Sequence, residues 1–95
     1  MTSERIANIR IRLQDAFDPD ELEIIDDSHL HAGHAGARDG RGHFRVRIIS
    51  ERFRNVRPLQ RHRMVFDALG SMMDTDIHAL SVSAEAPIKH QENAS

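Results

Sequence analysis

The sequence predicts an α+β domain in which a three-stranded mixed sheet carries its helices on one face. Residues 44–48 alternate apolar and basic side chains, as a half-buried strand does, whereas apolar residues in 59–69 recur at helical steps of three and four. Residues 77–84 alternate again. Because parallel strands need a crossover connection, the helix between the second and third strands indicates that these two strands run parallel.

The first part of the chain predicts a helix and a short strand. Apolar residues recur at helical spacing over residues 6–17, with Ser3 placed to cap the helix and Pro19 placed to end it. Residues 22–26 then predict a strand with Leu22 and Ile24 inward and Glu23 outward. We expect Glu23 to pair across the sheet with an arginine of the second strand.

The second helix is expected to begin at Pro58, whose fixed φ suits the first helical turn, and to continue to about Met73. Asn55 tolerates the left-handed backbone of the preceding turn. A histidine on an apolar helix face is usually a structural residue, so we expect His62 to support the fold or a neighbouring ligand. The predicted apolar stripe contains Leu59, His62, Val65 or Phe66, and Leu69.

The third strand is expected at residues 77–84, after an exit turn at 74–76. The domain would then span residues 1–86, followed by a polar tail at 87–95 that frays or forms a short terminal helix. Strand alternation sorts the side chains into two predicted faces, one with His78, Leu80 and Val82 and the other with Ile77, Ala79 and Ser81.

Composition excludes several classes of protein. The 95 residues suffice for one domain, and the absence of cysteine excludes a disulfide scaffold, a cysteine nucleophile and a metal site built on this chain's own thiolates. No apolar run reaches the roughly 18 residues of a membrane span, and the N-terminus lacks the apolar core of a signal peptide. We therefore expect a cytoplasmic protein without a membrane partner.

The segment from 28 to 42 is rich in glycine and histidine. It holds four of the five glycines and connects two expected strands, and connections of this length are usually functional or disordered. His29, His31 and His34 lie close enough in sequence to reach one cation, and imidazole suits Zn, Cu, Fe and Ni. Spacing alone also allows three solvated loop histidines, because no dedicated metal motif is present.

Positive charge is concentrated around the turn before the second helix. Arginine suits two-pronged contacts to phosphate, and a basic turn at a helix N-terminus attracts anions. The alternatives are pairing with the chain's own acidic segment at residues 15–27, or docking of an acidic protein. An isoelectric point near 6.4 disfavours strong non-specific DNA binding. The candidate nucleic-acid contacts are Arg52, Arg54, Arg57, Arg61 and Arg63.

The same region resembles a known family. Arg52-Phe53 followed by the LQRHRMV motif at residues 59–65 is similar to the signature of BolA-like proteins, and the IHAL motif at 77–80 resembles their last strand. Asp27-Ser28 and the HFRV motif at 43–46 match their first two strands. The resemblance covers roughly residues 3–84 and implies a KH-like fold of the prokaryotic class. Asn55 stands where the family usually has glycine.

The resemblance also implies a partner and a cofactor. BolA-like proteins bind monothiol glutaredoxins and share a [2Fe–2S] cluster with them, to which the BolA side contributes a loop residue and a histidine of the last strand. Matched by motif, the strand histidine is His78 and the loop ligand is His31, with His34 and His29 as alternatives. A partner cysteine and glutathione would supply the sulfur ligands.

The sequence leaves two further functions open. Some BolA-like proteins are transcription regulators, so the basic turn and helix imply a second hypothesis, binding of double-stranded DNA. A small KH-like binding module without metal is the third, and weak homodimerisation stays open. An enzyme is not expected, because the chain has no phosphate-binding glycine loop, no HExxH motif and no recognisable Ser/His/Asp arrangement.

Overall fold

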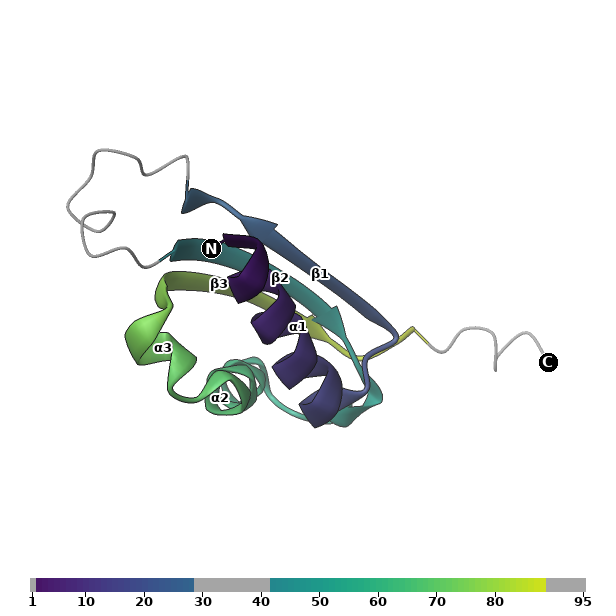
Figure 1. The fold of residues 1–95 in the computed structure, drawn as a ribbon. Helices are drawn as coiled ribbons and strands as arrows, with labels where there is room; N and C mark the ends of the chain where they lie inside the picture. Colours follow the sequence, from purple (N-terminus) through teal and green to yellow (C-terminus); the bar gives the residue numbers. More distant parts are fainter. Residues whose placement is uncertain (1, 29–41, 89–95) are drawn as a thin grey trace.

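The computed structural model describes residues 2–28 and 42–88 (Figure 1). The three strands form one sheet in the order β1-β2-β3, with β1 antiparallel and β3 parallel to β2. The described helices lie on one face of this sheet (Figure 1), so the predicted α+β mixed sheet is confirmed. The elements are α1 (Thr2–Phe17), β1 (Glu21–Asp26), β2 (Gly42–Ile49), the 3-10 helix η3 (Glu51–Phe53), α2 (Pro58–Leu69), α3 (Met72–Thr75) and β3 (Ile77–Glu85).

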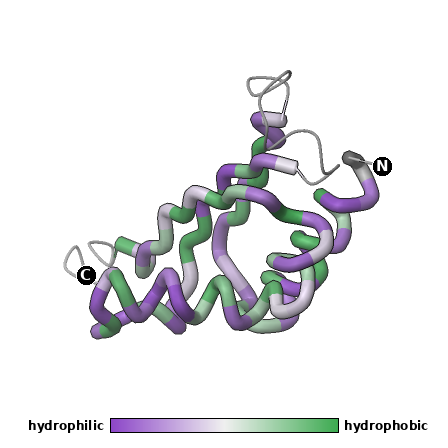
Figure 2. The backbone as a smooth tube through the Cα atoms, turned by 90° about the vertical axis from the view of Figure 1, so that its left-hand side faces the viewer, coloured by the Kyte–Doolittle hydropathy of each residue, from purple (hydrophilic) through white to green (hydrophobic). Residues whose placement is uncertain are grey.

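The core lies between the helices and the covered face of the sheet. Every second residue of β2 is buried there, and Figure 2 shows the corresponding alternation of hydropathy along the tube. We call the opposite, uncovered side of the sheet the outer face. The buried apolar residues are Ile9, Leu13, Phe17, Phe44, Val46, Ile48, Phe53, Val65, Leu69, Met72, Ile77 and Ala84.

Helix α1 follows its predicted stripe but starts earlier than expected. It begins at Thr2, so Ser3 lies inside the helix and the predicted cap at Ser3 is wrong. At the other end the chain leaves the helix at Asp18, whose φ is 44°, and Pro19 follows. No helix in the described ranges is long and apolar enough to cross a membrane.

Helix α2 is shorter than predicted, because Gly70 ends it. Gly70 has a φ of 54°, and its N–H donates to the carbonyl of Phe66 at 3.0 Å, so the chain turns before α3 begins at Met72. The prediction of one helix to Met73 with an exit turn at 74–76 is therefore wrong. The left-handed conformation is one that glycine adopts at little cost.

The apolar stripe of α2 was also partly mispredicted. Val65 and Leu69 are buried as expected, but Leu59 is 64% exposed and Phe66 is 36% exposed. Successive helical residues are rotated by about 100°, so Leu59 points roughly 120° away from Val65 around the helix axis. The turn before the helix agrees with its prediction, because Asn55 has a φ of 65°.

Strand β3 contains an irregularity that resets its alternation. Ile77 pairs with Gly42, whereas Ala79 pairs with His43, so β3 has one extra residue at His78. A β-bulge of this kind leaves one residue outside the regular pleat. Ile77 is therefore buried on the same side as Leu80, and the predicted grouping of His78 with Leu80 is wrong. Residues 86–88 form neither helix nor strand, and the rest of the predicted tail lies outside the described residues.

Candidate functional site

Two histidines meet on the outer face of the sheet, where β2 and β3 begin. His43 is only 8% exposed, whereas His78 is exposed at the β-bulge. The centroids of their rings lie 5.1 Å apart, and the ring planes are tilted by 49°. We call His43 and His78 the histidine pair.

The backbone of His43 is fixed by hydrogen bonds to residues at the end of β1. Its N–H donates to the hydroxyl of Ser28 at 3.0 Å, and its carbonyl accepts from the N–H of Asp27 at 2.7 Å. The N–H of Ser28 in turn donates to Oδ1 of Asp26 at 2.8 Å. These bonds extend the pairing of β1 with β2 to the last described residue before position 29, so His43 occupies a defined place.

Gly42 brings the two strands together beside the histidine pair. Its N–H donates to the carbonyl of Asp76 at 2.9 Å, which ties the start of β2 to the start of β3. A Cβ atom at this position would lie 2.5 Å from Cε2 of Phe44 and 3.1 Å from Oγ of Ser28. The close approach of the Phe44 ring to this backbone therefore requires glycine.

An ion pair stands next to the histidine pair. Both Oδ atoms of Asp27 accept hydrogen bonds from the guanidinium of Arg45. This hydrogen bond, and then the negative charge of Asp27, raise the pKa of Arg45 above its ordinary value. A hollow of about 160 Å³ lies beside the ion pair, and it is lined by Asp27, His43, Phe44, Arg45, Ala79 and Ser81.

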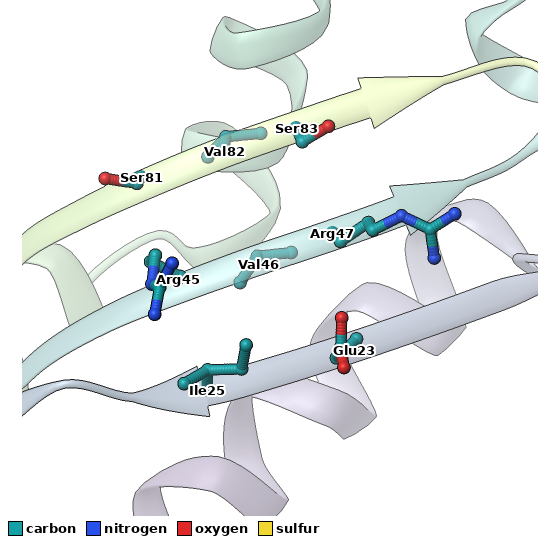
Figure 3. A pocket seen from close by; sticks show the side chains of 8 residues that line it. All are labelled: Glu23, Ile25, Arg45, Val46, Arg47, Ser81, Val82 and Ser83. Carbon is teal, nitrogen blue, oxygen red and sulfur yellow. The ribbon is translucent and has the colours of Figure 1, made fainter.

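The outer face continues along the strands as an open groove that charged, polar and apolar side chains line together (Figure 3). Arg47 forms its ion pair with Glu21 at 3.0 Å, although Glu23 is its partner in the strand register. The expected cross-strand pair of Glu23 is therefore replaced by a diagonal one. The groove has a volume of about 260 Å³, and its lining comprises Glu23, Ile25, Arg45, Val46, Arg47, Ser81, Val82 and Ser83.

The histidine pair places two imidazoles at one end of the sheet, with their ring centroids 5.1 Å apart. Within the described residues, however, no group of three or more histidine, cysteine, aspartate or glutamate residues could hold a metal. Any third ligand must therefore come from outside the described residues or from another molecule.

Only some of the predicted site residues belong to the described part of the chain. His78 stands at the start of β3, whereas His29, His31 and His34 lie outside the described residues. The flanking residues of that segment, Ser28 and Gly42, both lie at the end of the sheet that carries the histidine pair.

Sequence reasoning assigned no site role to His43. The signal was available: alternation puts His43 on the same face as Arg45, and parallel pairing brings the starts of β2 and β3 together. His62 lies on α2, on the opposite side of the sheet from this pair.

The five candidate arginines divide into two groups. Arg54 donates to both carboxylate oxygens of Glu51 and to the carbonyl of Pro87, and Arg61 donates to the carbonyls of Val56 and Ala84. These two side chains therefore hold the turn and the end of β3 together. The other three are exposed, and each has no ion pair with another described residue: Arg52, Arg57 and Arg63.

Comparison with known proteins decides the family. Residues 13–89 match the profile of the family described as BolA-like protein. The chain belongs to the BolA-like family. It is 41% identical over 87 residues to BolA-like protein 1 of Mus musculus, and 39% identical over 82 residues to the DNA-binding transcriptional regulator BolA of Escherichia coli. These matches cover 92% and 86% of this BolA-like chain.

Solved structures agree with this assignment. The BolA domain of SufE1 from Arabidopsis thaliana superimposes with a TM-score of 0.77 at 39% identity, over 87% of this BolA-like chain and 92% of that domain. The solution structure of BolA1 from Mus musculus gives a TM-score of 0.72 at 40% identity, over 94% and 70% of the two chains.

This BolA-like chain spans only part of the length of the curated relatives that it matches. It spans 61% of the mouse BolA-like protein 1 and 23% of the Arabidopsis SufE-like protein 1, chloroplastic/mitochondrial, but 72% of the Escherichia coli regulator. By their names, the mouse protein is a BolA-like protein and the bacterial one a regulator, and neither name states an enzymatic activity.

Proposed function

We propose that this BolA-like protein is an accessory factor in iron–sulfur cluster assembly or trafficking. It binds a monothiol glutaredoxin and contributes imidazole ligands to a [2Fe–2S] cluster that the two proteins share. The observation that carries the proposal is the exposed His78 at the β-bulge, beside a second imidazole and beside the two ends of the histidine-containing segment. The ligands from this chain are His78 and one loop histidine, with His31 first and His34 or His29 as alternatives.

The chemistry of the chain makes a partner necessary. It has no cysteine, and its described residues bring two imidazoles together but no third metal ligand. The sulfur ligands therefore come from the glutaredoxin cysteine and from glutathione. Imidazole ligation raises the reduction potential of such a cluster relative to four thiolates. The exposed position of His78 allows a second protein to approach it, whereas a buried ligand would not.

The direct test is cluster reconstitution with a monothiol glutaredoxin and glutathione, followed by visible absorption and circular dichroism. His78→Ala should lose or alter the spectrum of the mixed complex. Ser83→Ala changes an exposed residue of the same strand and serves as the matched control. The three loop variants His31→Ala, His34→Ala and His29→Ala then identify the second ligand. An unchanged spectrum with His78→Ala would remove the ligand assignment.

A second function, transcriptional regulation through DNA, has its own support. Three exposed arginines surround the start of α2, and the similar Escherichia coli protein is named a DNA-binding transcriptional regulator. Each phosphate contact contributes a slope of about −0.9 to the dependence of log K on log salt. Arg57→Ala should therefore flatten this dependence by about one unit for duplex DNA, whereas Arg10→Ala, a change on α1, should not. Equal slopes for both variants would exclude phosphate binding at the start of α2.

A further inference from the structure

We infer that His43 is the positioning residue for His78, and that the β-bulge and the His43 ring together aim the His78 imidazole. This inference rests on the proposed function, because it concerns the orientation of the ligand that function requires. It assigns no metal ligand to His43. It is based on the contact between the two rings and on their different exposure, since His43 is nearly buried whereas His78 is exposed.

The β-bulge explains the position of His78 on β3. The extra residue of β3 stands between the pairs Gly42–Ile77 and His43–Ala79, and it displaces His78 from the regular pleat. Bulges commonly redirect one side chain while the strand continues. In a regular strand that kept the pairing of Ala79 with His43, His78 would pair with Gly42 and lie on the same face as Leu80, toward the core. With the bulge, Leu80 returns to the core and the His78 ring reaches His43.

Contact with the ring of His43 explains how the orientation of the His78 side chain is restricted. An exposed side chain on an irregular strand can occupy several rotamers, and contact with a fixed neighbour reduces that number. His43 is such a neighbour, because its backbone is hydrogen-bonded to Asp27 and Ser28 and the residue is nearly buried. Loss of a group that orients a metal-ligating histidine through a hydrogen bond typically costs about 10–100-fold in metal affinity, and we take the same range for loss of the packed ring.

Two variants separate positioning from the alternatives. His43→Phe keeps an aromatic ring against His78 but has no ring nitrogen, whereas His43→Ala removes the ring. Positioning predicts that the mixed complex with glutaredoxin loses cluster affinity by about 10–100-fold in His43→Ala and by no more than about 3-fold in His43→Phe. Equal losses in both variants would mean that a nitrogen of His43 is needed, and unchanged affinity in His43→Ala would mean that the ring has no role. Either result overturns the inference.

A second readout uses the protein without any cluster. In NMR spectra of the free chain, the His78 ring protons should shift in His43→Ala and remain in contact with the new ring in His43→Phe. Val46→Ala is the matched control for a general loss of stability, since it removes buried packing from β2 on the opposite face. It should lower the melting temperature without moving the His78 signals. Equal movement of these signals in Val46→Ala would also overturn the inference.

The two proposals fail in different ways. If the unmodified chain forms no shared cluster with a monothiol glutaredoxin, the proposed function fails, but the NMR comparison still decides whether His43 orients His78. If the cluster forms and His43→Ala binds it normally, only the positioning role is excluded.

Discussion

Gly42→Ala tests the packing that brings the histidine pair together. The added Cβ would lie 2.5 Å from Cε2 and 2.6 Å from Cζ of Phe44, and 3.1 Å from Oγ of Ser28. The Phe44 ring is 2% exposed, so it has little room to move aside. The hydroxyl of Ser28 accepts the hydrogen bond from the N–H of His43, so displacing it weakens that contact as well.

The expected cost is that of overpacking. Forcing an extra methyl group into a well-packed core typically lowers the free energy of unfolding by about 1–3 kcal/mol. For a domain of this size, each kcal/mol shifts the melting temperature by roughly 4–8 °C. We therefore expect Gly42→Ala to lower the melting temperature by at least about 4 °C.

Urea unfolding of four proteins provides the assay: the unmodified chain, Gly42→Ala, Phe44→Leu and the double variant. Leucine lacks the ring atoms that the new Cβ would meet, so the second change should relieve the first. The double variant should be less destabilised than the sum of the single variants by at least about 0.5 kcal/mol. Additive losses would show that the contact with the Phe44 ring is not the cause, and this reasoning would then be wrong.

Three further predictions test other parts of the fold by urea unfolding. Ser50→Ala should lower the free energy of unfolding by about 1–3 kcal/mol, because the buried Ser50 hydroxyl joins the end of α1 to η3. As a control, the exposed Ser83→Ala should change the free energy of unfolding by less than about 0.5 kcal/mol. Gly70→Ala should cost about 1–2 kcal/mol, because alanine disfavours a φ of 54°, and an unchanged stability would mean that the turn does not need glycine. Leu59→Ser should stay within about 0.5 kcal/mol, and a larger loss would contradict the exposed position of Leu59.

The fold was predictable because its signals are local and repeated. Phe44, Val46 and Ile48 alternate through β2, and Ile9 and Leu13 repeat on α1, so each element shows its buried side within a few residues. The errors arose where one residue changes the pattern. An extra residue in β3 and a left-handed Gly70 after α2 each shift the alignment of the residues that come after them, and neither has a periodic signal.

The candidate site was harder to predict, because it depends on contacts between distant residues. His78 was identified through a family motif, whereas His43 becomes important only when the register places it beside the bulge. The same limit applies to the arginines. Arg54 and Arg61 look like Arg57 in the sequence, yet they bind carbonyl groups 33 and 23 residues away along the chain.

The proposed shared cluster would account for the contrast between the two rings of the histidine pair. A closed structural site buries four ligands around the ion, but here one imidazole is nearly buried and the other is exposed at the end of the sheet. When a neighbouring side chain fixes the orientation of an exposed ligand, less side-chain entropy is lost on binding. The gain in affinity is largest where a second protein brings the further ligands. Under the two proposals, the ring of His43 positions and the ring of His78 binds, so a partner that supplies sulfur would meet an imidazole already held in place.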